Sequence, residues 1–159
     1  MRLILCAFLF VLLGCGSTIQ SSKNLKNEEI VFSTISKGKL LGNGIEWIIE
    51  EKFTITNEKQ WQVFLNKINS VNNVSLSFTE TNINFSNHII ICVFDAIRNT
   101  GGYAIEIKRV FVEKNNLNIV FTKKEPGPME MVTTAITQPY HIVKIEKRGE
   151  DHKFINKNQ

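Results

Sequence analysis

Hydrophobic residues recur at every second position over much of this 159-residue chain, and at helical spacing in one clear segment. In that segment Asn57 is a favourable N-cap and Gln60 stands at the capping-box position. The apolar residues that follow lie at i, i+3, i+4 and i+7 and share one helix face: Trp61, Phe64, Leu65 and Ile68. The sequence therefore predicts a β-rich fold with one amphipathic helix, over about residues 58–69, lying on a sheet.

The clearest alternating pattern covers residues 45–55. Polar residues separate the apolar ones, and only Ile48 and Glu51 break the alternation. This pattern predicts a half-buried antiparallel strand. Its buried face would carry Ile45, Trp47, Ile49, Phe53 and Ile55.

Other segments predict further strands. Residues 88–95 predict a central strand because 89–94 form a continuous apolar run, and residues 103–112 and 117–122 predict a hairpin. Shorter strands are expected at 30–35, within 70–87, at 133–137 and at 141–147, with a glycine-rich hairpin connection at 38–44. The fold class is predicted as α+β: an antiparallel sheet of about six or seven strands with one helix packed on it. A β-sandwich or a partly open barrel is the alternative.

The N-terminal residues predict export. Arg2 precedes an eleven-residue apolar run at 3–13, which has the length of a signal peptide. It ends in Leu-Leu-Gly-Cys15, which resembles the lipobox of bacterial lipoproteins. We expect a signal peptide at 1–14, a lipid on Cys15, a flexible tether over 15–28, one globular domain at 29–147 and a frayed polar tail at 148–159. A plain secretory signal with a coincidental cysteine is the alternative.

This organisation predicts a lipid-anchored envelope protein. No acidic cluster follows Cys15, which favours a domain that faces the periplasm, and we expect the outer membrane as its location. The charge of the whole chain is modest, at +4, and its basic residues are dispersed without aromatic interleaving. We therefore expect no nucleic-acid partner.

The sequence contains no pattern typical of catalysis or of metal binding. Its histidines, at positions 88, 141 and 152, have no ligand spacing, and no P-loop, G-x-S-x-G or dinucleotide motif is present. Cys92 lies in the apolar run, where a small buried filler is the expected role. We expect no enzymatic activity, no metal and no cofactor.

Three turn segments are the candidate partner-binding residues, because binding residues concentrate on loops held by a rigid scaffold. The competing interpretation is structural, with glycines serving turns and tyrosine rings packing in the core. The candidates are Asn99, Thr100, Gly101, Gly102 and Tyr103 in the first segment, Pro126, Gly127 and Pro128 in the second, and Thr137, Pro139 and Tyr140 in the third.

These segments also carry a family resemblance. Thr-Gly-Gly-Tyr at 100–103 followed by Ile-Glu-Ile, then Pro-Gly-Pro, then Ala-Ile-Thr-Gln-Pro-Tyr at 135–140 and Ile-Val-Lys-Ile, resembles the C-terminal domain of the protease complex subunit PrcB family over about residues 98–147. The resemblance implies an accessory protein that assembles with or stabilises an envelope protease, and it brings no catalytic residue with it.

Two other functions remain open. Residues 99–103 resemble one loop of chagasin-type cysteine protease inhibitors, and Gln138-Pro-Tyr140 is a partial parallel to another. The chain departs from that pattern because it lacks a proline after Asn99, a Gly-x-Gly-Gly loop and an arginine before Pro139. The third possibility is a small-ligand pocket under the predicted helix.

Overall fold

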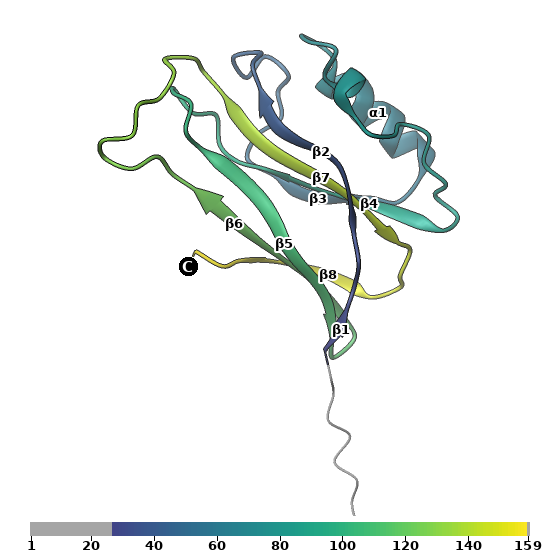
Figure 1. The fold of residues 1–159 in the computed structure, drawn as a ribbon. Helices are drawn as coiled ribbons and strands as arrows, with labels where there is room; N and C mark the ends of the chain where they lie inside the picture. The colour runs from purple at the N-terminus through teal and green to yellow at the C-terminus, as the bar shows by residue number, and fades with distance from the viewer. Residues whose placement is uncertain (1–26, 159) are drawn as a thin grey trace, which may run out of the picture.

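The computed structural model describes residues 27–158, in which eight strands form two open four-stranded sheets (Figure 1). The signal peptide, Cys15 and most of the tether predicted from the sequence lie outside these residues. The first sheet has the order β1 (Glu28–Glu29), β5 (Ala104–Glu113), β6 (Asn116–Lys124), β8 (Asp151–Asn156). The second has the order β2 (Ser33–Leu40), β7 (Gln138–Glu146), β4 (His88–Phe94), β3 (Lys52–Ile55).

The prediction of one sheet with six or seven strands is wrong, because the strands are eight and divide between two packed sheets. Alternation shows that one face of a strand is buried, but it does not show which strands are its neighbours. The single helix on a mainly antiparallel β structure is as predicted. Nothing in residues 27–158 is helical over enough apolar length to cross a bilayer.

The continuous apolar run at β4 has a structural reason. Ile89, Ile91 and Val93 face the first sheet and form one hydrophobic core with residues of β5, β6 and β7. Ile90, Cys92 and Phe94 face the opposite way and form a second core with the helix. Because β4 is covered on both faces, its side chains are apolar at successive positions and not alternately.

The helix α1 (Glu58–Ile68) forms as the sequence predicts. The Asn57 side chain accepts a hydrogen bond from the Gln60 backbone at 3.0 Å, and Gln60 Oε1 accepts one from the Thr56 backbone at 2.9 Å. Trp61 is fully buried, and its indole nitrogen donates to the carbonyl of Thr81 at 2.8 Å. Trp61 is therefore a core residue, as expected.

The predicted hairpin of β5 and β6 is confirmed. Lys114 and Asn115 connect the strands with φ values of 49° and 63°, the left-handed pair that fits a two-residue turn to twisted strands. A bulge interrupts the ladder between Ile107 and Arg109. Beside this bulge, the backbone amide of Ile107 donates a hydrogen bond to His141 of the other sheet.

The predicted strand at 45–55 is mostly wrong. Only Lys52–Ile55 pairs as a strand, and residues 42–47 turn twice, with Ile45 N–H donating to Gly42 at 3.0 Å and Trp47 N–H to Gly44 at 3.1 Å. The expected faces are also reversed. Ile48 is buried, whereas the side chains predicted to be buried, Ile45, Trp47 and Ile49, are exposed.

Four other expectations need correction. Residues 70–87 contain the 3₁₀ helix η1 (Val74–Ser77) and no strand, and residues 133–137 contribute only one bridge, between Arg98 and Thr137. The first long strand begins at Ser33 and runs through Gly38, so its turn starts later than expected. The tail is not frayed, since β8 pairs in parallel with β6. Its side chains alternate between half-buried and exposed, and backbone pairing needs no apolar pattern.

Candidate functional site

Three loops lie together at one end of the two sheets, and we call residues 41–51, 95–103 and 125–137 the loop end. They join β2 to β3, β4 to β5 and β6 to β7 (Figure 1). Strand pairing brings them together, because Leu40 is opposite Gln138, Phe94 is opposite Tyr140 and Ala104 is opposite Lys124. β1 lies at the other end of the molecule.

Backbone hydrogen bonds join the second and third loops. Arg98 and Thr137 exchange two bonds, of 2.7 and 2.9 Å, and the Gly101 amide donates to Thr133 at 2.9 Å. The Thr137 hydroxyl donates to the carbonyl of Thr100 at 2.8 Å. The two loops are therefore one rigid unit, although they are far apart in the sequence.

Gly102 allows a close approach between these loops. Its φ is 87°, and a Cβ atom there would lie 2.7 Å from Val132 and 2.8 Å from Pro126. The next residue, Tyr103, packs under the guanidinium of Arg98, which lies 4.5 Å from the ring centroid. Gly102 therefore serves both the turn and the packing of the third loop.

Replacing Gly102 with alanine is expected to lower the free energy of unfolding by about 2–3 kcal/mol, because it combines a strained φ with a steric clash. Gly127 is the matched control. A Cβ there meets nothing within 4 Å, so Gly127→Ala should change stability by less than about 0.5 kcal/mol. Urea denaturation measures both, and equal stabilities would contradict this account of the loop.

A buried ion-pair network connects the first and second loops through Lys123 of β6. The Asp95 side chain is fully buried and lies 2.8 Å from Arg98 Nη2 and 2.7 Å from Lys123 Nζ, and Lys123 also pairs with Glu50. Burial by itself would raise the pKa of Asp95, but hydrogen bonds from Lys123 and Arg98 outweigh it and hold the pKa below 3.8. Asp95 is therefore a buried anion at neutral pH.

Gln138 attaches the first loop to this base. Its side-chain nitrogen donates to the carbonyls of Ile48, at 2.6 Å, and Asp95, at 2.9 Å. Gly44 packs directly against Ile97 of the second loop. These hydrogen bonds, ion pairs and packing contacts hold the loop backbones together, and we call this set of contacts the braced base of the loop end. Other side chains project from it.

The structure divides the residues predicted to bind a partner. Three are exposed, Asn99, Gly127 and Pro128, and four are half-buried, Thr100, Gly102, Tyr103 and Pro126. The others are buried: Gly101, Thr137, Pro139 and Tyr140. The ring of Tyr140 stacks on Phe94, and its hydroxyl bonds with Ser36 Oγ at 3.0 Å. That position favours the structural role that the sequence left open for Tyr140.

The sequence interpretation missed the apolar surface of the loop end. Of the thirteen large apolar side chains that are exposed in residues 27–158, eight lie on these loops. Trp47 is 79% exposed, and Met129 and Met131 are each 98% exposed. The other five are Leu41, Ile45, Ile49, Ile97 and Ile136. The first loop was missed because its alternation is also the pattern of a buried strand.

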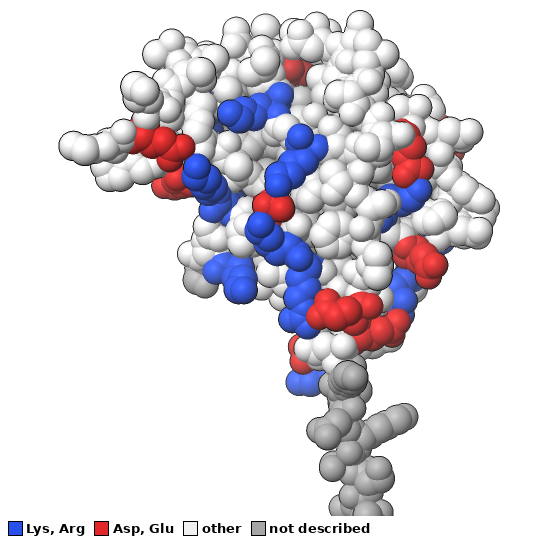
Figure 2. Space-filling view, in the orientation of Figure 1, with Lys and Arg blue, Asp and Glu red and all other residues white. Residues whose placement is uncertain are grey.

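The loop end is also acidic, in contrast to the net charge of +4 for the whole chain. Its basic residue is Arg98, which is paired with Asp95. Figure 2 shows lysine and arginine from the upper middle of the visible face downward, and a group of acidic side chains at its upper left edge. The acidic residues of the loops are six: Glu46, Glu50, Glu51, Asp95, Glu125 and Glu130.

Glu46 is an unusual member of that set. It is 1% exposed, and both carboxyl oxygens are buried with no hydrogen-bond partner among the described residues. We expect Glu46→Met to raise the free energy of unfolding by about 1–2 kcal/mol, because an apolar side chain of similar length loses no polar contact. Glu51→Met is the control, with a change within about 0.5 kcal/mol. A loss of stability in Glu46→Met would show that the carboxyl group is satisfied.

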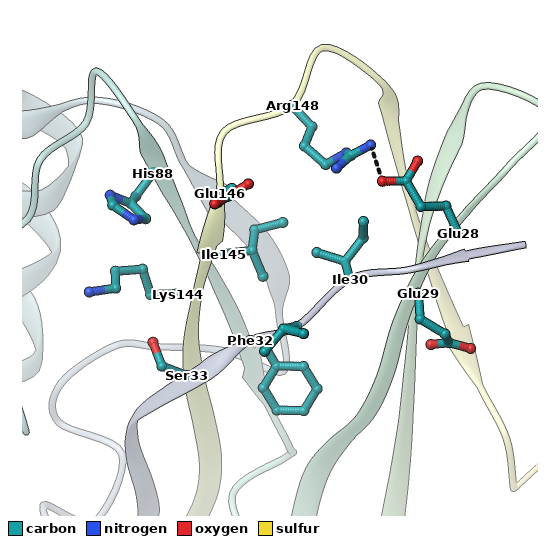
Figure 3. Close-up of a pocket in the computed structure, with 11 residues that line it drawn as sticks. Glu28, Glu29, Ile30, Phe32, Ser33, His88, Lys144, Ile145, Glu146 and Arg148 are labelled. Atoms are coloured by element: carbon teal, nitrogen blue, oxygen red, sulfur yellow. Dashed lines mark hydrogen bonds and ion pairs between the residues drawn. The ribbon is translucent and has the colours of Figure 1, made fainter.

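Several hollows lie outside the loop end, and two of them are lined in part by apolar side chains. The first, of about 420 Å³, is where the chain passes from β1 to β2 beside the end of β7 (Figure 3). Charged groups at its rim are already paired, Arg148 with Glu28 at 2.9 Å and Lys144 with Glu80. The second, of about 380 Å³, lies between α1 and β3 and includes Phe53 and Phe64. It is the place where a small ligand beside the helix would bind.

Groups with metal or nucleophilic chemistry do not converge at any of these places. Within residues 27–158 no three His, Cys, Asp or Glu side chains are arranged to hold a metal ion. Cys92 is a fully buried residue of β4 in the core shared with α1, and burial raises the pKa of its thiol well above the ordinary value. The chemistry that the loop end offers is apolar and acidic surface.

The family comparison covers two of the three loops. Residues 89–146 match the family model described as PrcB C-terminal. The resemblance expected from the sequence is confirmed for this segment, which runs from β4 to β7. No curated protein and no solved structure matches the chain. The PrcB C-terminal match thus contains the second and third loops, and the first loop lies before it.

Proposed function

We propose that the chain is a non-enzymatic accessory module of the cell envelope, which binds a partner protein through the loop end and assembles with, or stabilises, an envelope protease. The observation that carries the proposal is the set of eight exposed apolar side chains on a braced base. Exposed apolar patches on soluble domains are typical of protein-binding surfaces. The PrcB C-terminal match over residues 89–146 supports a protease complex as the setting.

The position of β1 supports the same proposal. A lipid on Cys15 would anchor the module in the outer membrane, on the periplasmic side, with more than one acyl chain giving stable attachment. The chain enters the described fold at β1, at the end opposite the loop end (Figure 1). An anchored module would then have its loop end free to meet a partner.

The test is affinity purification of the full chain from its native envelope, followed by mass spectrometry. Wild-type protein is compared with Met129→Ser/Met131→Ser, which changes the loop end, and with Val63→Ser, which changes an exposed apolar residue on α1. We expect an active protease to be enriched with wild type and with Val63→Ser, and to be lost from the double variant. Equal recovery with all three proteins would contradict the proposal.

An inhibition assay distinguishes the chagasin-like alternative, which would use the same end of the molecule. The full chain is titrated into papain-like and serine proteases. An accessory subunit leaves the activity of its protease intact, whereas a wedge inhibitor abolishes it at stoichiometric concentration. Potent inhibition of a purified protease would replace the accessory proposal with the inhibitor.

A further inference from the structure

We propose that Trp47 is the central anchor of the loop end, and that the partner protein offers it an apolar pocket bordered by lysine and arginine side chains. The inference rests on the proposed function and adds the residue and the chemistry of recognition. It concerns the first loop, which neither the sequence motifs nor the PrcB C-terminal match includes.

Trp47 is held outside the core by its backbone. Its φ is 54°, which is uncommon for a bulky residue, and its amide donates to Gly44, whose own φ is 78°. The neighbouring residues on each side, Glu46 and Ile48, are buried. The indole therefore projects from the surface, and tryptophan is one of the residue types enriched among those that dominate binding at interfaces.

The base under Trp47 is pre-organised. Ile48 is inserted in the core beside the helix, and its carbonyl accepts the hydrogen bond from Gln138. Gly44 packs on Ile97 so closely that a Cβ atom would clash with it. Because these contacts exist in the free protein, a partner that buries the indole has little loop entropy to overcome.

Apolar neighbours extend the surface around the indole. Ile45 and Ile49 lie two residues away on either side, and both are more than half exposed. Ile97 brings the second loop to the same place through its contact with Gly44. An anchor surrounded by weaker apolar contacts that exclude water is the usual anatomy of a binding hot spot.

The charge of the loop end identifies the partner chemistry. Glu50 is engaged by Lys123, whereas Glu51 and Glu125 form no ion pair in the described residues. Unpaired acidic side chains on the loop end repel the anionic surface of a membrane or a nucleic acid, and they favour a protein surface with basic residues. The occupant is therefore a protein with an apolar pocket and a basic rim.

The test begins with a benzophenone amino acid placed in the full chain at position 47, 131 or 63 and irradiated in the native cell. We expect position 47 to cross-link to a protein other than a second copy of this chain, at a peptide that combines apolar with lysine or arginine residues. Position 131 should reach the same protein, and position 63, on α1, should not.

The purified cross-linked protein is then used as the binding probe. We expect Trp47→Ala to weaken binding by about 30-fold or more, and Val63→Ala by less than about twofold. Glu51→Lys/Glu125→Lys should weaken binding by about tenfold at low salt, with a smaller effect at high salt. Glu113→Lys, at the opposite end of the sheet, should not. Trp47→Ala should keep the wild-type melting temperature because the side chain is exposed.

The outcomes separate the two proposals. Cross-links from 131 without any from 47, or unchanged affinity in Trp47→Ala, would overturn the role of Trp47 and leave the proposed function standing. Absence of cross-links from both positions would overturn both. Cross-links to a second copy, or binding to phosphatidylglycerol vesicles that Trp47→Ala abolishes, would replace the proposed partner with the chain itself or with a membrane.

Discussion

Replacing Asp95 with alanine is expected to lower the free energy of unfolding by about 3–5 kcal/mol, with a fall in Tm of roughly 10 °C or more. The carboxylate is fully buried and pairs with Arg98 and Lys123. Without it, Lys123, whose side chain is only 17% exposed, keeps a single partner in Glu50. The cost comes from leaving a desolvated cation poorly compensated, more than from losing the attraction itself.

Asp151 provides a matched control for this experiment, since it is the other aspartate of the chain and is exposed. Asp151→Ala should change stability by less than about 0.5 kcal/mol in the same thermal and urea measurements. The pKa of Asp95 is lowered in the folded state, so its contribution is present above pH 3.8 and is lost as the pH falls through the folded value. Similar free energies of unfolding for the two variants at pH 7 would contradict the claim that the ion pairs of Asp95 stabilise the loop end.

Acidification from pH 6.5 to 4 is expected to destabilise the protein by about 3 kcal/mol through His141 alone. This ring joins the two sheets. It lies on β7, and its Nδ1 accepts a hydrogen bond of 2.9 Å from the Ile107 amide, next to the bulge in β5. The ring proton is therefore on Nε2, which donates to Thr34 Oγ1 at 3.0 Å. A proton on Nδ1 would destroy the bond between the sheets.

The environment of His141 disfavours that proton. Burial lowers its pKa from 6.5 to about 4, and the positive charges of Lys37 and Lys108 act in the same direction, against the opposing effect of Glu106. Between those pH values the unfolded chain binds a proton that the folded chain excludes. The contribution of the neutral His141 ring to the free energy of unfolding is therefore fully present above pH 6.5. It decreases as the pH falls to about 4, and below that pH this group causes no further loss.

The measurement compares urea denaturation of wild type and His141→Gln at several values between pH 4 and 7. The variant is expected to be less stable at pH 7 and to have a shallower dependence on pH. His152 also has a pKa lowered by burial, so some slope remains in both proteins. Identical slopes would mean that His141 is not the titrating group.

The sequence predicted those elements whose local and tertiary preferences agree. α1 has a cap, a single apolar stripe and a core that accepts it, so its limits were predicted almost to the residue. The β5–β6 hairpin combines alternation with Asn115, a residue type that tolerates positive φ. β4 was recognised as a central strand because both its faces are apolar.

The wrong predictions arise where the backbone geometry differs from the one that the hydrophobic pattern indicates. Residues 45–49 alternate as a strand would, yet Gly42 and Gly44 turn the chain before it can pair, and Ile48 enters the core in place of its neighbours. The division into two sheets depends on which strands are neighbours, and an alternating pattern carries no information about strand order. β8 has too few apolar residues to predict a strand from its sequence.

The candidate site was predicted in part. The glycine and proline turns do meet at one end of the molecule, but they mainly form its base, and Tyr140 is in the core. The residues that project from that base are apolar, and sequence reasoning assigns apolar residues to the interior. One signal was available for the first loop, since Ile48 and Glu51 both break its alternation.

The C-terminal strand has a consequence for solubility. β6 carries Leu117, Ile119 and Phe121, and an unprotected strand of this kind recruits strands from other molecules. β8 occupies that side and presents Asp151 and Lys153 to solvent. Proteolytic removal of the residues after Gly149 would therefore expose the unpaired backbone amides and carbonyls of β6. The trimmed protein is then expected to self-associate through this edge.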